Sequence, residues 1–328
     1  MRLLVTGGAG FVGSHYVRTV LSGGYPRFAD AEVTVLDKLT YSGNRHNLDP
    51  VADRPALTFL QGDVCDVPLL DDVVPGHDAI VHFAAESHVD RSIRGPAAFV
   101  RTNVLGTQTV LDAAMQHAVR RVVVVSTDEV YGSIETGSCT EDAPLRPNSP
   151  YSASKAGGDV LARAYHRTYG LDVVVTRCTN NYGPYQYPEK IVPLFVTNLL
   201  LGEPVPLYGD GMGVRDWLHV DDHCRGVQLA LERGRAGEIY HIAGGTQLTN
   251  NELTERLLAA VGADWDRVRR TADRQGHDRR YSLDDGKIRS ELGYQPRIDL
   301  AHGLSDTVRW YRNRRDWWGP LRARTAGP

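Results

Sequence analysis

The chain opens with the segment LLVTGGAGFVG at residues 3–13. Its apolar start is typical of a buried strand, and it leads directly into the glycines Gly7, Gly10 and Gly13. In nucleotide-binding βαβ units, the first glycine permits a tight turn and the second lets backbone amides approach a pyrophosphate, while the third lets the helix pack closely on the strand. Spaced glycines also occur in ordinary turns. Their position directly after the first strand favours a dinucleotide site.

Strand-like and helix-like segments alternate through the first half of the chain. Nearly continuous apolar runs, as in strands buried on both faces, occupy residues 2–6, 32–37, 57–61, 78–83, 121–126 and 173–177. Helical segments occupy residues 12–22, 97–117 and 152–169. This alternation predicts an α/β fold with a doubly wound parallel (Rossmann) sheet.

Beyond residue 183 prolines become frequent and the alternation ends. We therefore expect a smaller, discontinuous C-terminal lobe that closes over the carboxyl edge of the sheet. The Rossmann domain is predicted to comprise residues 1–183 and a return strand at about 238–245. The second, substrate-binding lobe is predicted to comprise residues 184–237 and 246–328.

The composition is that of an ordinary globular protein. Of the 328 residues, 41% are hydrophobic and 23% charged, and no apolar run approaches the roughly 20 residues of a membrane helix. The net charge of −3 argues against a nucleic-acid-binding surface. The four cysteines show no CxxC spacing, which favours reduced thiols and a cytoplasmic protein without a metal site. The chain starts with a strand, so we expect no signal peptide.

Two acids after predicted strands bear on the choice of cofactor. Asp37 ends the second strand, where an acid binds a ribose 2′-hydroxyl and repels a 2′-phosphate, so NAD is favoured over NADP. Lys38 weakens this argument because a lysine there would tolerate a phosphate. Asp63, after the third strand, is placed to meet the adenine edge, although it would equally serve as a cap for the following helix.

The segment VVVVSTDEVYG at residues 122–132 combines a buried strand with two adjacent acids, Asp128 and Glu129. Ligands of open α/β sheets bind at this carboxyl end of the strands. Consecutive side chains of a strand point to opposite faces, so the two acids share a site only if the chain turns here, as Gly132 would allow. The alternative is a solvated acidic loop.

Tyr151 and Lys155 stand one helical turn apart and face the same side of a predicted helix. A tyrosine that acts as a base near neutrality needs its pKa lowered by about three units, roughly 4 kcal/mol. Lys155 and a positively charged nicotinamide ring would lower it. YxxxK is common by chance, but it is specific when it follows a strand that ends in Ser126-Thr127 within a glycine-loop domain.

These motifs together resemble the extended short-chain dehydrogenase/reductases, and among them the dTDP-glucose 4,6-dehydratases. The resemblance spans nearly the whole chain and rests on the segments TGGAGFVG (6–13), DKLTYSGN (37–44), AAESHVDR (84–91), STDEVYG (126–132), YSASK (151–155), NNYGP (180–184) and ADRQGHDRR (272–280). Epimerases, decarboxylases and reductases share the glycine loop and YxxxK. The triplet at 127–129 and the segment at 273–277 are typical of the dehydratase.

The resemblance implies a redox-neutral elimination of water from dTDP-glucose to dTDP-4-keto-6-deoxyglucose, with NAD oxidising C4 and returning the hydride to C6. Tyr151 would take the C4 hydroxyl proton, Thr127 would hydrogen-bond that hydroxyl, and Lys155 would hold the tyrosinate and a ribose. Glu129 would remove the C5 proton. Asp128 would protonate the departing C6 hydroxyl, for which its pKa must be raised by burial and by the charge of Glu129.

The same resemblance implies two further sets of contacts. The residues expected at a tightly bound NAD are Gly7, Gly10, Phe11, Val12, Gly13, Asp37, Lys38, Leu39, Thr40, Asp63, Val64, Phe83, Ala84, Ala85, Glu86, Thr102, Tyr151, Lys155 and Asn181. The residues expected at the sugar nucleotide are Ser87, Thr127, Asn180, Glu189, Lys190, Pro206, Leu207, Tyr208, Arg215, Asn250, Arg274 and His277. For three of these residues a structural role is the alternative to ligand binding. Glu86 would be a buried structural acid, Arg215 would form a surface ion pair with Asp216, and His277 would cap a loop.

Other functions remain open at this stage. A nucleoside-diphosphate-sugar 4-epimerase or a decarboxylase would use the tyrosine–lysine pair but not the two acids. A UDP-glucose 4,6-dehydratase differs only in the base, and one methyl group gives little discrimination. A non-catalytic NAD sensor would have lost the tyrosine–lysine pair or the acids, and all are present. The helices at 97–117 and 152–169 resemble those through which the superfamily forms homodimers.

Overall fold

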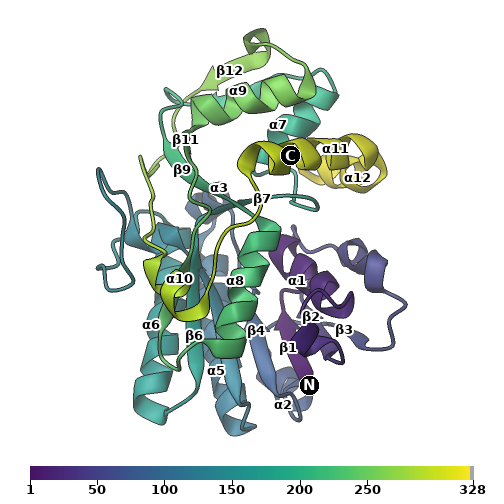
Figure 1. The fold of residues 1–328 in the computed structure, drawn as a ribbon, viewed down its shortest axis with the longest axis vertical. Helices are drawn as coiled ribbons and strands as arrows, with labels where there is room; N and C mark the ends of the chain where they lie inside the picture. The colour runs from purple at the N-terminus through teal and green to yellow at the C-terminus, as the bar shows by residue number, and fades with distance from the viewer. Residues whose placement is uncertain (326–328) are drawn as a thin grey trace.

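The N-terminal glycine loop joins the first strand and the first helix of a parallel sheet (Figure 1). The computed structural model describes residues 1–325. In sheet order the strands are β10 (Ile239–Ile242), β6 (Val173–Cys178), β5 (Arg121–Thr127), β4 (Ala79–His82), β1 (Arg2–Thr6), β2 (Glu32–Asp37) and β3 (Leu57–Gln61). All neighbouring pairs are parallel. The predicted doubly wound sheet is therefore confirmed.

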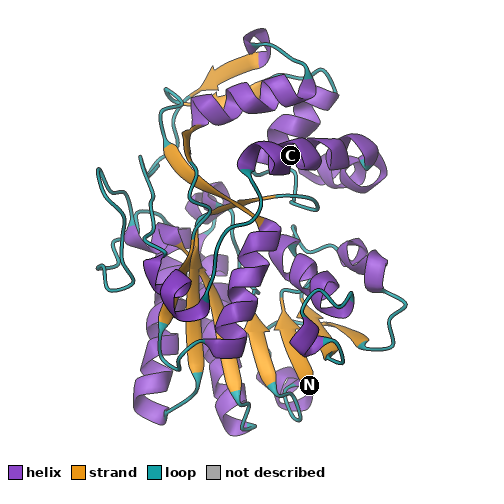
Figure 2. Ribbon diagram, viewed as in Figure 1, coloured by secondary structure: helices purple, strands orange, loops and turns teal. Residues whose placement is uncertain are grey.

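Helices cover both faces of the sheet, because its strands are apolar on both sides (Figure 2). One face packs against α1 (Phe11–Leu21) and α8 (Val220–Arg233). The other packs against α2 (Val67–Val73), α5 (Thr107–Gln116) and α6 (Pro150–Tyr169). Shorter helical segments in the connections are η1 (Pro26–Phe28), η2 (Arg45–Val51) and α3 (Val89–Arg94).

A second lobe with its own apolar core stands above the carboxyl edge of the sheet (Figure 1). Its elements are α7 (Ile191–Leu200), β8 (Val205–Tyr208), β9 (Val214–His219), β11 (Gln247–Thr249), α9 (Asn250–Val261), η5 (Trp265–Arg267), β12 (Val268–Thr271), α11 (Leu300–Asn313) and α12 (Arg315–Thr325). The short β7 (Asn180–Tyr182) pairs with β9 and links the lobes. α10 (Gly286–Leu292) packs instead on β10 and α8, so this late segment lies beside the sheet. The division into domains stays a prediction.

The prediction of one uninterrupted helix at 97–117 is wrong in its middle. The segment consists of α4 (Pro96–Val100), a π-helical stretch η3 (Arg101–Gly106) and α5. The wider turn carries Asn103, whose side-chain amide accepts from the Glu86 N–H (2.9 Å) and donates to the Glu86 carbonyl (3.0 Å) and to Ser154 Oγ (2.8 Å). π-Helical turns commonly mark functional sites, and this one holds the loop after β4.

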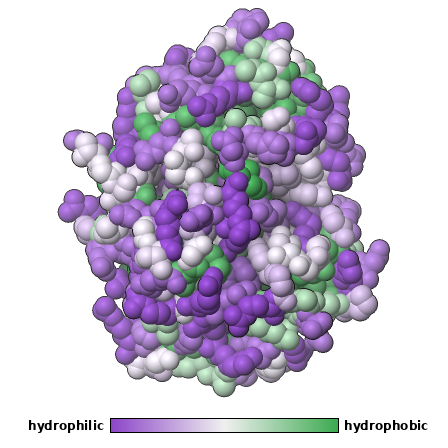
Figure 3. All heavy atoms as spheres, in the orientation of Figure 1, coloured by the Kyte–Doolittle hydropathy of each residue, from purple (hydrophilic) through white to green (hydrophobic). Residues whose placement is uncertain are grey.

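The molecular face in Figure 3 is largely hydrophilic, and apolar residues appear on it as separate patches. Within residues 1–325, no helix combines the length and the apolar character that crossing a membrane requires.

Candidate functional site

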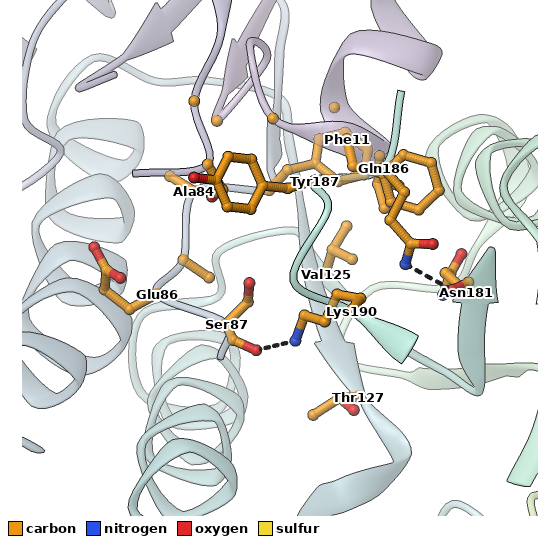
Figure 4. Close-up of a pocket in the computed structure, with 18 of the residues that line it drawn as sticks. Phe11, Ala84, Glu86, Ser87, Val125, Thr127, Asn181, Gln186, Tyr187 and Lys190 are labelled. Carbon is orange, nitrogen blue, oxygen red and sulfur yellow. Dashed lines mark hydrogen bonds between the residues drawn. The ribbon is translucent and has the colours of Figure 1, made fainter. Parts of the chain in front are cut away.

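A cleft opens at the carboxyl ends of β1, β2, β4, β5 and β6, and Figure 4 shows part of its lining. It gathers most of the residues predicted from the sequence: Gly7, Gly10, Phe11, Val12, Gly13, Asp37, Lys38, Thr40, Asp63, Val64, Phe83, Ala84, Ala85, Glu86, Ser87, Thr102, Thr127, Asp128, Glu129, Tyr151, Lys155, Asn180, Asn181, Glu189 and Lys190. The predicted residues outside its lining are Leu39, Pro206, Leu207, Tyr208, Arg215, Asn250, Arg274 and His277.

The glycine loop forms a cradle at one end of the cleft. Gly7 has φ +70°, which favours glycine, and a Cβ on Gly13 would stand 2.3 Å from the Gly7 carbonyl oxygen. A Cβ on Gly10 would meet only that same oxygen, at 3.3 Å, so the space above this residue is open. No side chain caps the N-terminus of α1. The loop and the positive helix end therefore fit an anionic diphosphate.

Asp37 ties the loop to the second strand. Its buried carboxylate accepts hydrogen bonds from the backbone N–H groups of Ala9 (2.9 Å) and Leu39 (2.8 Å). Burial raises the pKa of Asp37, and these backbone donors oppose the rise. The carboxylate lines the cleft, where the sequence predicts that it accepts from a ribose hydroxyl.

Lys38, which left the choice of cofactor uncertain, has a carboxylate partner. Its ammonium donates to Asp63 Oδ2 at 2.8 Å. Burial acts to raise the pKa of Asp63, but the bond from Lys38 and that from the Cys65 N–H hold it below its ordinary value. The helix that follows is capped by Asp66, so the alternative of Asp63 as its cap is wrong. The engaged lysine favours an acidic ribose pocket without a phosphate.

The two acids after β5 turn into the protein. The strand ends at Thr127 and a 3₁₀ turn, η4 (Asp128–Tyr131), follows directly. Thr127 Oγ1 donates to Asp128 Oδ1 at 3.1 Å, and the Glu129 N–H donates to Thr127 Oγ1 at 3.3 Å. Asp128 is 3% exposed, and its Oδ2 is buried without a partner. The alternative of a solvated acidic loop is therefore wrong.

The surroundings of the two carboxyl groups shift their pKa values to different extents. Burial, and then the charge of Glu129, raises the pKa of Asp128 well above its ordinary value. Burial also raises the pKa of Glu129, but three cations, Lys190, Arg274 and Arg215, oppose this rise. The arrangement favours a protonated Asp128 beside a more readily ionised Glu129, which is the asymmetry of an acid and a base.

Tyr151 and Lys155 lie in the first turns of α6, which Ser149 caps through a capping box. Burial, and then the charge of Glu129, raises the pKa of Tyr151. The ammonium of Lys155 donates to the Val125 carbonyl at 2.7 Å. The joint effect of Lys155 and a bound nicotinamide on the pKa of this tyrosine stays a prediction.

The predicted substrate residues beyond the cleft form a second cluster beside it. Tyr208 (β8) stacks edge-on with His277 at 6.4 Å between ring centroids, and its hydroxyl lies 3.4 Å from Asp90 Oδ2. Arg274 is within 3.7 Å of the same carboxylate group, and its Nε is buried without a partner. His277 Nδ1 bonds Asp273 at 2.7 Å, so the interpretation of His277 as a loop cap also remains compatible.

Arg215 is buried rather than paired at the surface. It is 6% exposed and donates to the Asp278 carbonyl at 2.7 Å, while its guanidinium lies 4.4 Å over the Tyr281 ring. Asp216 accepts instead from the N–H groups of Gly244 and Thr246. The alternative of a surface ion pair is therefore wrong. Asn250 starts α9 close to Arg215, because both approach Gly213. Pro206 and Leu207 lie in β8 with Tyr208.

A segment from the second lobe closes one wall of the cleft (Figure 4). Glu189 is held by a bidentate ion pair with Arg91 (2.9–3.2 Å). Lys190 donates to the Ser87 carbonyl at 2.6 Å. Tyr187 packs edge-on against Tyr41, with centroids 5.8 Å apart. Both predicted substrate residues here thus have protein partners, and they also fix the wall.

Some lining residues were missed from the sequence, notably Tyr41, Gln186, Tyr187, Trp217 and His223. His223 Nδ1 bonds Asn181 Oδ1 at 2.9 Å, while His223 Nε2 and Trp217 Nε1 are buried without partners. Only the Pro-rich composition around 184–193 hinted at an irregular wall. His223 comes from α8, far along the chain, and no spacing reveals it. In the described part of the chain, no cluster of three or more His, Cys, Asp or Glu could hold a metal ion.

The glycine cradle, the parallel sheet and the tyrosine–lysine helix beside the two acids of η4 define an extended short-chain dehydrogenase/reductase. The chain belongs to the GDP-mannose 4,6 dehydratase family, whose sequence profile matches residues 4–307. It is 63% identical over 329 residues to the dTDP-glucose 4,6-dehydratase of Streptomyces antibioticus, covering 100% of this chain and 97% of the relative. The resemblance inferred from the motifs is thereby confirmed.

Solved structures agree with this assignment to the family. DesIV, a dTDP-glucose 4,6-dehydratase from Streptomyces venezuelae crystallised with NAD and dTDP, is 66% identical with a TM-score of 0.97, covering 98% of this chain and 100% of that chain. The UDP-glucose 4-epimerase of Thermotoga maritima with UDP-glucose is 33% identical with a TM-score of 0.87, covering 95% and 99%.

Proposed function

We propose that the chain is an NAD-dependent dTDP-glucose 4,6-dehydratase, a lyase that converts dTDP-glucose to dTDP-4-keto-6-deoxyglucose. The observation that carries the proposal is that the buried Asp128 and the partly buried Glu129 line one cleft with Tyr151 and Lys155. A 4-epimerase needs only the tyrosine and lysine. A site that also holds a buried acid and a base supports elimination of water.

The cleft fits NAD. The open space above Gly10 and the uncapped start of α1 would hold the pyrophosphate, and Asp37 would accept from a ribose hydroxyl. Lys38 is engaged by Asp63, which favours NAD over NADP. DesIV was crystallised with NAD, which supports the same cofactor here. When bound, NAD would accept hydride from C4 of the sugar and return it to C6, so that the reaction is redox-neutral.

The chain's own groups would perform the proton transfers. Tyr151 would accept the proton of the C4 hydroxyl, with Thr127 orienting that hydroxyl. Glu129 would remove the C5 proton, and Asp128, whose pKa burial raises, would deliver a proton to the C6 hydroxyl. The C6–O bond then breaks, water leaves, and a double bond forms between C5 and C6. Arg215, Asn250, Arg274 and His277 would hold the diphosphate side of the substrate.

Deuterium transfer tests this function. dTDP-glucose deuterated at C4 should give a 4-keto-6-deoxy product with the label at C6, transferred within one molecule. Label lost to solvent or retained at C4 would refute the dehydratase and favour another member of the superfamily. Parallel assays with UDP-glucose measure how strongly the enzyme discriminates between thymine and uracil in the substrate.

We further propose that the enzyme is a cytoplasmic homodimer. Val100, Leu105 and Val160 are 53%, 45% and 56% exposed on α4, η3 and α6, which pack side by side. A second copy would bury this apolar surface. The four thiols are free, which supports a reducing compartment. Solution scattering should give a dimer, and Val160→Glu should shift the protein to monomers.

A further inference from the structure

Four polar side chains outside the cleft lining form a buried chain that we call the Arg177 network. Its members Asp159, Arg177, Tyr131 and His241 are between 0% and 4% exposed. Arg177 Nε donates to Asp159 Oδ2 at 2.7 Å, and Arg177 Nη1 donates to the Tyr131 hydroxyl. Tyr131 lies 2.6 Å from His241 Nε2, and His241 Nδ1 lies 2.8 Å from the Asp284 carbonyl.

The network has a single arrangement of protons. Burial lowers the pKa of His241 to about 3, so its ring is neutral near pH 7. A carbonyl oxygen only accepts, so His241 Nδ1 carries the ring proton and donates to Asp284. His241 Nε2 must then accept from Tyr131, whose oxygen accepts in turn from Arg177. Every bond has one direction, and such a chain holds its members in one geometry.

The network joins the two segments that carry the proposed chemistry. Asp159 lies on α6 one helical turn beyond Lys155, and Tyr131 ends the η4 turn that starts at Asp128. Arg177, on β6, bonds to both. It is paired in register with Ser126 on β5, two residues before the turn. One guanidinium therefore spans from the tyrosine–lysine helix to the acid-bearing turn.

The acid side chains make few hydrogen bonds of their own, and the η4 turn that carries them is held at Val130, which is buried and accepts from the Arg146 N–H at 3.0 Å, and at Tyr131. Asp128 has a single side-chain partner, Thr127, and its second oxygen has none. Their placement thus follows the backbone of η4, whose last side chain, Tyr131, is bonded to Arg177 and His241. A buried ion pair is poor evidence of a stability role, because hydrophobic replacements are often as stable.

We propose that Tyr131 and Arg177 are positioning residues, which hold the η4 turn against α6 so that Asp128 and Glu129 reach the sugar beside Tyr151. This inference rests on the proposed dehydratase function. It assigns the network to the elimination step and leaves the preceding oxidation at C4 to Tyr151 and Lys155, whose helix keeps its own cap and packing.

The test compares Tyr131→Phe with Tyr240→Phe. Tyr240 is 0% exposed, and its hydroxyl donates to Glu291 at 2.9 Å and accepts from the Arg235 N–H at 3.1 Å, so this control, like Tyr131→Phe, removes a buried tyrosine hydroxyl with two hydrogen bonds. It precedes His241 in β10 and therefore points to the opposite face of the sheet. For both variants we would measure melting temperature, NAD content, kcat and KM for dTDP-glucose, and the reduced nicotinamide that accumulates during turnover.

Tyr131→Phe should lower kcat about 10- to 100-fold with little change in KM, because small misplacement of a reacting group has effects of this size. Reduced nicotinamide should accumulate, since oxidation continues while elimination slows. Tyr240→Phe should lower the melting temperature and retain kcat. An unchanged kcat in Tyr131→Phe, an equal loss in Tyr240→Phe, or a loss confined to the oxidation would overturn the inference.

A second pair of variants covers the case in which Tyr131→Phe does not fold. His241→Gln keeps an acceptor for Tyr131, whereas His241→Leu removes it. The glutamine variant should retain more kcat than the leucine variant, and equal values would overturn the inference. A wild-type protein that forms no 4-keto sugar would refute the proposed function. Wild-type turnover matched by both Tyr131→Phe and His241→Leu would refute the network alone.

Discussion

Replacing Asp128 by asparagine should remove the acid of the elimination and leave the fold intact. The side chain is 3% exposed and has one partner, the Thr127 hydroxyl, which an amide oxygen would still accept. Its Oδ2 has no partner, so the new amide nitrogen displaces no hydrogen bond. The substitution therefore separates proton transfer from packing.

The size of the kinetic effect follows from general acid catalysis. A positioned acid contributes about 10²- to 10⁴-fold, so Asp128→Asn should raise the barrier by roughly 3–5 kcal/mol. Glu129→Gln should cause a comparable loss, because the base of the same step disappears. NAD content should match the wild type, since both residues lie at the sugar end of the proposed site. Turnover is measured by formation of the 4-keto sugar.

The Asp128→Asn substitution also has a predictable effect on the pH dependence of stability. Burial raises the pKa of Asp128 in the folded state above its unfolded value. Its contribution to stability is therefore fully present below the unfolded pKa and is lost as pH rises through the folded pKa. Asparagine does not titrate, so the melting temperature of Asp128→Asn should fall less than that of the wild type as pH rises. Two results would refute the reasoning: turnover equal to that of the wild type, or melting temperatures that change equally with pH in the variant and the wild type.

Three further outcomes are expected. Tyr151→Phe should suppress the first oxidation, seen as loss of reduced nicotinamide in a single turnover, and full activity would mean that another base operates. Gly13→Ala should prevent tight NAD binding, measured by cofactor content after purification, because its Cβ would stand 2.3 Å from the Gly7 carbonyl oxygen. Arg177→Met should lower the free energy of unfolding by about 3–5 kcal/mol in denaturant titration, because Asp159 would keep a buried charge without a partner; a loss below about 1 kcal/mol would contradict this reasoning.

The fold class and the family were accessible from the sequence because their signals are local. Each buried strand is a short apolar run, and the glycine loop and YxxxK have fixed spacings that steric and helical geometry impose. The interruption of the helix at 97–117 was not accessible, because nothing in its periodicity reveals the π-helical turn in which Asn103 holds the Glu86 loop.

Charge states and partners depended on contacts between distant segments. The sequence placed Asp128 and Glu129 after β5, but their burial and the opposing cations come from η4, the second lobe and the segment after β12. Lys155 stands beside Tyr151 in the sequence, yet its ammonium bonds the Val125 carbonyl. Desolvation and electrostatic shifts depend on everything packed around a group, so residue type and spacing specify the reactive groups while packing sets their pKa values.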